Sequence, residues 1–426
     1  MEFLQLEYLI DGGGLCEKPK VKSRKNDRYA KKGVKNEKGY SISYFYFAIL
    51  VGLVAAFSTA ASADQGPDWL PGFGNGAVFT MTNAVTETPE KVGPPIYTPA
   101  PNAVIMFSRD ANGMLTSDGS FATGGDGGLR SGPPDPLVSQ GSLVLTQDGK
   151  WLLAVNAGSN SISVFQVEKN KLSLVGATPS GGNFPVSITI FGNEVFVLNA
   201  GTMSNITGFT LSNTGTLTPI AGSTRLVIGA SVMSVFSQVG FDNTGKWLIV
   251  TDKSDSLILA FPVSSGIPGA EVKSTSDGPA PFGLAFDGQD HLLVVQAGNS
   301  AVASYSVMPS GMLSPIVEAF NPTSSTACWI VKDQMGNVFT TNPGSMNISS
   351  YEDLDNSGNV GWLNPSAASG ITTIDEGITN NSQYLYALAP GVGIDGYKIS
   401  FDGSLKMVGT FTATGITATS QGLAAW

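Results

Sequence analysis

The feature that most constrains this chain is an internal repeat, because self-similarity at a fixed period specifies an architecture before any single element is assigned. Six copies align with few gaps. They begin at Ser139, Phe184, Ser237, Pro281, Ala327 and Asp375. Within each copy, apolar alternation, a turn containing Asp, Asn or Gly, and a second apolar run follow one another. This order predicts consecutive antiparallel strands, and helical spacing is nowhere sustained.

One residue closes the second apolar run of every copy and gives the period. These residues are Asn83, Asn156, Asn199, Asp252, Gln296, Asn342 and Ala389. Their spacings are 73, 43, 53, 44, 46 and 47 residues. All but the first are close to the ~40 to 50 residues of a four-stranded propeller blade. The count is seven blades, with six or eight as the alternatives.

The two ends of the repeat region predict how the ring closes. The tail TATSQGLAAW, ending at Trp426, is similar to the opening strand SQGSLVL of the copy that begins at Ser139. GAVFTMTN, which ends at Asn83, is similar to a second strand. We therefore expect an all-β, seven-bladed β-propeller of four-stranded antiparallel blades, closed by the C-terminal strand pairing into the first blade. Such closure removes an exposed sheet edge.

The first 63 residues differ in character from the rest. A basic stretch precedes the apolar run YFYFAILVGLVAA, from Tyr44 to Ala56, and Ala61-Ser62-Ala63 follows it. Thirteen apolar residues are few for a membrane span but suit the core of a signal peptide. Residues 1–63 are thus predicted to be a cleaved leader and residues 64–426 a single propeller domain, periplasmic or secreted. A retained membrane anchor is the alternative.

Charge restricts the possible partners. The chain has 23 Lys and Arg against 33 Asp and Glu, and ten of those basic residues lie in the leader. A strongly acidic body disfavours nucleic acid and an anionic membrane surface. We expect a monomer that binds a small molecule or carbohydrate, with no nucleic acid and, after cleavage, no membrane contact. No motif suggests a cofactor, and no cluster of Cys and His suggests a metal.

VNAGSNSISVF, and VLNAG followed by NITGF, resemble the YVTN-type repeats of the lactonase family of seven-bladed propellers, relatives of 6-phosphogluconolactonase and carboxymuconate cyclase. The resemblance implies activity on lactone rings and, in cyclase-type members, a His, Glu and Arg set on the inner face. This chain departs from that set. Its single histidine, His291, lies at a strand edge, and Gln140 stands where some members carry a catalytic histidine.

Two insertions, after Asn83 and before Ser139, are expected to emerge at one face of the disc. Loops elaborated on a rigid scaffold commonly bind ligands, although drift in surface loops explains them equally well. The first strands should line the central channel and open at this face. Their opening residues are Gln140, Pro185, Gln238, Phe282, Trp329, Glu376 and Gln421. Gln140, Gln238, Gln421 and Trp329 would offer hydrogen bonds and a stacking surface to a sugar or lactone.

Charged residues near this face supply the catalytic candidates. Glu376, with Asp375 beside it, is the best candidate for a general base, and Asp252 with Lys253 is the second. Arg130 and Arg225 fall in connections at the same face and could clamp an anion. Solvated surface pairs are the simpler explanation for each of them.

Two classes of function remain open. The first is an exported, metal-independent hydrolase or isomerase acting on a lactone or related cyclic ester. The second is a non-catalytic extracytoplasmic propeller that binds a glycan, a small molecule or a protein. A shared pocket holding Glu376 and an arginine would favour the enzyme. An apolar face without convergent charges would favour the binding protein.

The leader assignment predicts the N-terminus of the mature protein. Because Ala61 and Ala63 are small residues at the two positions that signal peptidase reads, N-terminal sequencing of the protein recovered from an export-competent host should begin at Asp64. A sequence that starts upstream of Tyr44 would show that the apolar run is retained as an anchor.

Overall fold

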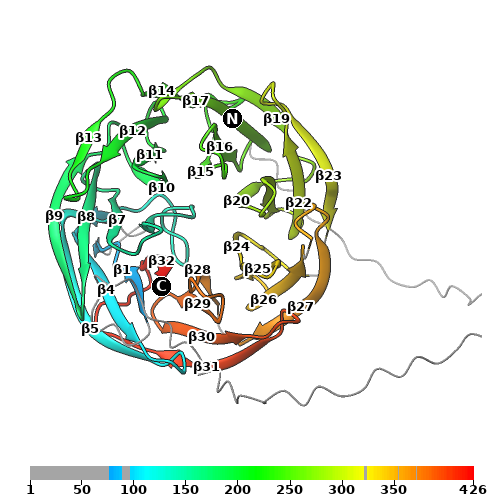
Figure 1. The fold of residues 1–426 in the computed structure, drawn as a ribbon. Coiled ribbons are helices and arrows are strands. Elements are labelled where there is room, and N and C mark those ends of the chain that lie inside the picture. Colours follow the sequence, from blue (N-terminus) through cyan, green and yellow to red (C-terminus); the bar gives the residue numbers. More distant parts are fainter. Residues whose placement is uncertain (1–75, 89–95, 321–323, 354, 371) are drawn as a thin grey trace, which may run out of the picture. The chain divides into compact units, whose positions relative to one another are not determined.

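The computed structural model describes residues 76–88, 96–320, 324–353, 355–370 and 372–426. The leader expected over residues 1–63 lies outside the described residues. The described chain forms seven antiparallel sheets arranged as blades around a ring, and one additional two-stranded hairpin (Figure 1). The seven-bladed propeller expected from the repeat is confirmed.

In each blade the strands follow one another from the channel outward. Blade 1 contains β32 (Gln421–Ala425), β1 (Ala77–Met81), β4 (Pro101–Arg109) and β5 (Leu115–Asp126). Blade 2 contains β6 (Leu143–Leu145), β7 (Trp151–Asn156), β8 (Ser161–Glu168) and β9 (Lys171–Pro179). Blade 3 contains β10 (Pro185–Phe191), β11 (Glu194–Asn199), β12 (Asn205–Leu211), β13 (Leu217–Pro219) and β14 (Arg225–Leu226). Blade 4 contains β15 (Phe236–Phe241), β16 (Trp247–Asp252), β17 (Leu257–Ser264), β18 (Ile267–Pro268) and β19 (Val272–Thr275).

The remaining sheets are more regular. Blade 5 contains β20 (Pro281–Phe286), β21 (His291–Gln296), β22 (Ala301–Val307) and β23 (Leu313–Phe320). Blade 6 contains β24 (Trp329–Lys332), β25 (Asn337–Asn342), β26 (Asn347–Glu352) and β27 (Gly361–Ser369). Blade 7 contains β28 (Ile374–Ile378), β29 (Tyr384–Ala389), β30 (Gly393–Ile399) and β31 (Leu405–Phe411). The hairpin of β2 (Val85–Thr88) and β3 (Ile96–Pro99) belongs to the first insertion.

The residue that marks each repeat has a common structural role. Six of the seven are the last residue of a second strand, and Asn83 follows β1 by two residues. Asn156 is fully buried and its Nδ2 donates to Ser163 Oγ at 2.8 Å. Asn342 makes the corresponding bond to Ser349 Oγ at 2.8 Å. These amides join the end of the second strand to the third strand, which is why a short polar residue recurs there.

Second strands are buried on both faces because each blade lies between two neighbours. All six residues of β7, β25 and β29 are buried. Strands covered on both faces carry nearly continuous apolar sequence. The outermost strands are exposed in alternation, as in β9 and β27. In the described part of the chain we find no helix with the length and apolar character needed to span a membrane.

The ring closes through the C-terminal strand, as the sequence predicted. Strand β32 pairs antiparallel with β1, placing Val78 opposite Ala425 and Phe79 opposite Ala424. Beyond the strand, the Trp426 amide donates to Ala77 O at 2.8 Å. Residues more than 300 positions apart therefore complete one sheet, which we call the clasp (β32 on β1).

Weakening the clasp should destabilise the whole ring. Leu423 in β32 is buried, so Leu423→Ala should lower the free energy of unfolding by about 2–5 kcal/mol, as truncation of a buried leucine does. Leu363→Ala, the same change on the partly exposed outer strand β27, is the matched control and should cost less than about 1 kcal/mol. Thermal melts measure both. Equal losses would show that the clasp has no special role.

Candidate active site

A short segment that we call the plug, residues 137–141, binds several other blades at the elaborated face. It follows the second insertion and runs inward toward the centre of the ring (Figure 1). The Ser139 carbonyl accepts hydrogen bonds from Trp329 Nε1 at 3.0 Å and Gln421 Nε2 at 3.2 Å. Ser139 Oγ donates to Val186 O at 2.9 Å. One residue of blade 2 thus binds blades 6, 1 and 3.

Gln140 extends the plug across the channel. Its backbone amide donates to Ser237 O in blade 4 at 3.2 Å. Its side chain donates to Ile330 O at 2.7 Å and accepts from Ile330 N at 3.1 Å, in blade 6. Because these are bonds to backbone groups of other blades, the plug is an integral part of the ring.

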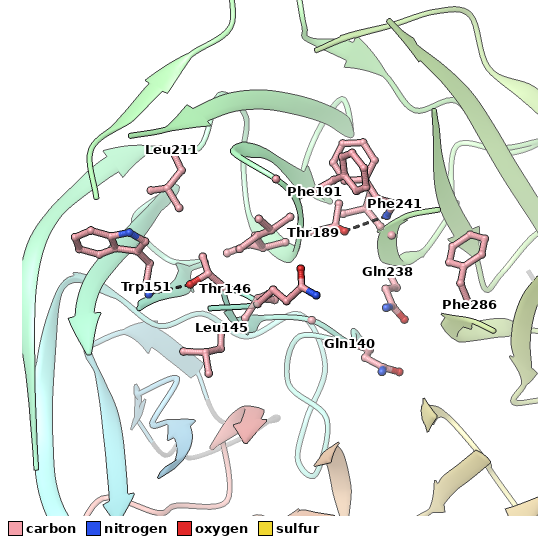
Figure 2. A pocket seen from close by; sticks show the side chains of 18 of the residues that line it. Gln140, Leu145, Thr146, Trp151, Thr189, Phe191, Leu211, Gln238, Phe241 and Phe286 are labelled. Atoms are coloured by element: carbon pink, nitrogen blue, oxygen red, sulfur yellow. Dashed lines mark hydrogen bonds between the residues drawn. The ribbon is translucent and has the colours of Figure 1, made fainter. Parts of the chain in front are cut away.

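A cavity of about 1330 Å³ lies in the channel, with the plug residues Gln140 and Gly141 in its wall. The first strands of blades 2, 3, 4, 5 and 7 contribute further lining residues, as does Leu423 of the clasp. Lining residues also come from the turns that follow the first strands, around Asp148, Asn193 and Asn243. We infer that the cavity opens at the face of these turns, opposite the insertions. Figure 2 shows its Gln140, Gln238 and aromatic side chains.

Asp375 and Glu376 both line this cavity although they are adjacent in β28. Neighbouring side chains of a regular strand point to opposite faces. Here the pairing with β29 shifts between Ile374 and Glu376, and Asp375 has φ of 32°. Such an irregularity re-aims side chains and occurs often beside active sites. Both residues thus belong to the cavity wall, but the Asp375 carboxyl binds the clasp. Both carboxyl oxygens of Glu376 are buried, on the side of the Thr341 backbone in blade 6.

Glu376 occupies a place in the first strand that carries an aliphatic residue in other blades. It pairs with Ala387 of the second strand, which lies two residues before the repeat marker Ala389. In blades 2 to 6, the first-strand residue that pairs with the corresponding second-strand residue is always aliphatic: Leu143, Ile188, Val239, Leu284 and Ile330. Only 5% of Glu376 is exposed, and neither carboxyl oxygen has a hydrogen-bond partner. The fold therefore places an aliphatic side chain where this blade carries an acid.

The surroundings of Glu376 favour its neutral form. Burial raises the pKa of its carboxyl well above 4.5, and the charge of neighbouring Asp375 adds to that shift. The nearby Thr341 backbone amide lowers the pKa of Glu376 and so partly opposes the effect of burial. Neither carboxyl oxygen accepts a hydrogen bond, however. Burial without a hydrogen-bonding partner disfavours the charged form, so the surroundings of Glu376 suit a proton donor.

Asp375 is equally buried but is hydrogen-bonded. Its Oδ2 accepts from Gly422 N at 2.7 Å and from Gln421 Nε2 at 2.9 Å. Burial raises the pKa of Asp375 to about 8, with the two donors lowering it and the charge of Asp135 raising it. Asp375 is thus the carboxyl of the pair whose ionised form is stabilised by donors.

The glutamines and the tryptophan expected at an open ring are instead engaged within the protein. Gln238 lines the cavity, and its amide both donates to Leu284 O at 3.2 Å and accepts from Leu284 N at 2.7 Å. Gln421 and Trp329 are buried against the plug and do not line the cavity. The expectation of an open ring at the elaborated face is corrected, because the plug fills that end. The ligand-binding role of these residues stays a prediction.

Gln238 and Glu376, which were expected at equivalent places in the ring of opening residues, do not occupy equivalent places. Gln238 pairs with Thr251, one residue before the marker Asp252, whereas Glu376 pairs two residues before its marker. Asp375 is the functional counterpart of Gln238, since each accepts a backbone amide of the next blade. Bulges in the first strands create this offset, and sequence alignment does not reveal them.

The two arginines do not reach the cavity. Arg130 is partly buried, and its Nη1 donates to Phe236 O at 3.3 Å. Burial lowers the pKa of Arg130, while the charges of Asp135 and Asp252 oppose that shift. Arg225 lies on β14, the outer edge of blade 3, and binds the carbonyls of Gly222 and Thr224. No arginine clamp beside Glu376 forms among the described lining residues.

The second candidate pair also lies outside the cavity. Asp252 accepts hydrogen bonds from Ser254 Oγ and Asp255 N, and burial raises its pKa. Lys253 Nζ lies 5.0 Å from the centre of the Phe282 ring. His291 Nδ1 is 2.7 Å from Asp287 Oδ2 and does not line the cavity. Within the described ranges, no group of three or more His, Cys, Asp and Glu could hold a metal ion.

Sequence reasoning missed an aromatic group in the cavity. Phe191, Phe241 and Phe286 are the last residues of β10, β15 and β20 (Figure 2). Phe191 and Phe241 lie 5.7 Å apart, centre to centre. Phenylalanine recurs at the same place in three consecutive copies of the repeat, and this recurrence could have identified the group from the sequence.

The fold and the cavity define a seven-bladed propeller with a cavity in its channel. Residues 101–236 match the model of the lactonase family, described as a lactonase 7-bladed β-propeller. The resemblance expected from the repeats is thereby confirmed, over a segment that is less than half of the chain. A search of curated protein sequences finds no match.

Solved structures show the same fold at low identity. A candidate 6-phosphogluconolactonase from Bacteroides uniformis is 19% identical with a TM-score of 0.58, over 81% of this chain and 98% of that one. The periplasmic gluconolactonase PpgL of Pseudomonas aeruginosa is 13% identical with a TM-score of 0.59, over 82% and 99%. A protein from Lactobacillus plantarum is 14% identical with a TM-score of 0.60, over 82% and 99%. At these identities the likeness establishes the fold alone.

The pKa of Asp375 predicts how stability depends on pH. Because folding raises this pKa from 3.8 to about 8, the stabilisation is complete below about pH 4 and is lost as pH rises through about 8. Asp375→Asn keeps an acceptor for Gly422 and Gln421, so its melting temperature should fall less over that range. Glu87→Gln, at an exposed hairpin position, should retain the wild-type slope. Parallel curves for all three proteins would contradict the assignment.

Proposed function

We propose that this protein is a lactonase-like hydrolase that opens a lactone or related cyclic ester in the central cavity. The observation that carries the proposal is the pair Asp375 and Glu376, two consecutive buried acids at a strand bulge in the wall of the cavity. Adjacent titratable groups with raised pKa values and different surroundings are typical of acid and base catalysts. The family match over residues 101–236 supports the ester class of substrate.

The different surroundings of the two carboxyls assign the roles. Asp375 has a pKa of about 8 and hydrogen-bond donors that favour its carboxylate, so it acts as the general base. It takes a proton from water while the water oxygen bonds to the lactone carbonyl carbon. Glu376 stays protonated and gives its proton to the ring oxygen as the ring C–O bond breaks. The product is the open hydroxy acid.

These roles revise the expectation from sequence. Glu376 was the expected base and an arginine the expected partner for the oxyanion. Neither Arg130 nor Arg225 lines the cavity. We therefore assign no cation to the oxyanion, and Glu376 acts as the acid toward the leaving ring oxygen. An isomerase acting on the same ring would use the same two groups.

A non-catalytic binding propeller for a glycan, small molecule or protein is the second candidate. Two observations favour it: the cavity has no arginine among its described lining residues, and the loop between blades 3 and 4 exposes apolar side chains. These are Leu226, Ile228, Val232 and Met233. Exposed apolar groups of this kind mark interaction surfaces.

Location and partners complete the proposal. The apolar run and the small residues before Asp64 support export to the periplasm or the medium. The fold is shared with a periplasmic gluconolactonase, which is consistent with that location. We propose a monomer that acts on a small-molecule or carbohydrate ligand without nucleic acid, membrane, cofactor or metal.

A lactone-hydrolysis panel on the purified protein tests the function. Glu376→Leu and Asp375→Asn should each lower kcat by about 10²–10⁴-fold, the usual contribution of a general acid or base. Wild-type activity should rise as pH increases through about 8, because Asp375 must ionise.

Stability separates a catalytic defect from misfolding. Glu376→Leu restores the aliphatic residue of the other blades and removes an unpartnered buried carboxyl, so it should stabilise the fold by about 1–3 kcal/mol. Glu87→Gln is the control with unchanged activity and melting temperature. Equal rates for wild type and both variants, or no turnover of any lactone, would exclude the enzyme as described.

A further inference from the structure

The titratable residues that line the cavity are all acids. They are Asp148, Asp242, Asp375 and Glu376, and none of the described lining residues is Lys, Arg or His. Phosphate and carboxylate groups are bound in proteins mainly by Arg and Lys or by helix N-termini. The described part of the chain offers neither in this cavity.

The two acids among the turns are held as hydrogen-bond acceptors. Asp242 Oδ1 accepts the backbone amides of Lys246 at 2.8 Å and Trp247 at 2.9 Å. Asp148 Oδ1 accepts Thr146 Oγ1 at 2.6 Å and Lys150 N at 3.0 Å. Both residues therefore add an acid to the wall of the cavity.

The nearest lysine does not join these acids in the cavity wall. Lys150 Nζ lies 4.8 Å from the centre of the Trp151 ring and donates to Asn213 O at 3.0 Å. That ammonium is therefore directed at a neighbouring turn, and it is outside the cavity lining. The cations on the other side, Arg130 and Lys253, do not line the cavity either.

The uncharged lining groups suit a sugar-like ring. Phe191, Phe241 and Phe286 offer aromatic faces, and the amides of Gln147 and Asn193 lie on exposed turns beside them. Apolar walls with a few convergent amides orient small ligands by their hydroxyl and carbonyl groups.

We propose that the cavity accepts uncharged polyhydroxy lactones, from the face opposite the insertions, and discriminates against their phosphorylated and carboxylated counterparts. This inference rests on the proposed function and adds the substrate class. A phosphate within several ångströms of two carboxylates is repelled, which corresponds to about tenfold weaker binding or more.

Binding of stable analogues tests the inference without requiring turnover. We would titrate the protein with D-glucono-1,5-lactam and with its 6-phosphate in a calorimeter. The neutral lactam should bind at least about tenfold more tightly than the phosphate. Raising the salt concentration should reduce the difference, because salt screens the repulsion.

Substitutions at the turns provide the matched comparison. Gln147→Lys and Asn193→Lys each add a cation to the lining and should narrow the preference for the neutral lactam by about tenfold. Gln383→Lys adds the same charge on the corresponding turn of blade 7, outside the lining. It should leave the preference unchanged.

The outcomes separate the two proposals. Equal affinity for both analogues, tighter binding of the phosphate, or no binding of the lactam would overturn the substrate class. Selective binding of the neutral lactam without hydrolysis of the corresponding lactone would uphold the selectivity and overturn the hydrolase.

Discussion

The antiparallel pairing of β32 with β1 is the interaction on which the rest of the structure depends. Without it, blade 1 lacks its innermost strand and β1 presents an unpaired edge. Blades are buried on both faces by their neighbours, so a gap in the ring would expose apolar strands on either side of it. The clasp also fixes Gln421 and Gly422, which are the hydrogen-bond donors to Asp375. Fold closure and the chemistry of the site therefore share the same residues.

Closure creates the channel, and the plug determines its use. Seven first strands converge on one axis, and Ser139 and Gln140 occupy one end by binding backbone groups of several blades. Desolvation is the largest cause of both raised pKa values in the pair. The second insertion leads into the plug, and the short turns of the opposite face contribute further lining residues of the cavity.

Most of the fold could be predicted from the sequence, because blade boundaries depend on local patterns. The polar residue that ends each second strand, such as Asn156 or Asp252, recurs for a local hydrogen-bonding reason and gives the period. The site was only partly predictable. Asp375 and Glu376 were identified as acids on a first strand, but their roles depend on a bulge and on burial. The bond between Gln140 and Ile330 joins residues 190 positions apart, and no local pattern encodes it. The plug was therefore interpreted as an open mouth.

The register of the first strands gives the strongest argument that Glu376 is functional. At its position the fold accepts leucine, isoleucine or valine in five other blades, and three of these, Ile188, Val239 and Leu284, line the same cavity. An unpartnered buried carboxyl costs stability that an aliphatic side chain would not. A structural role does not account for it, since Glu376 makes no hydrogen bond. Its neighbour Asp375 differs, because its bonds to the clasp also serve the fold. The acid that the architecture does not require is thus the residue on which the proposed chemistry most directly depends.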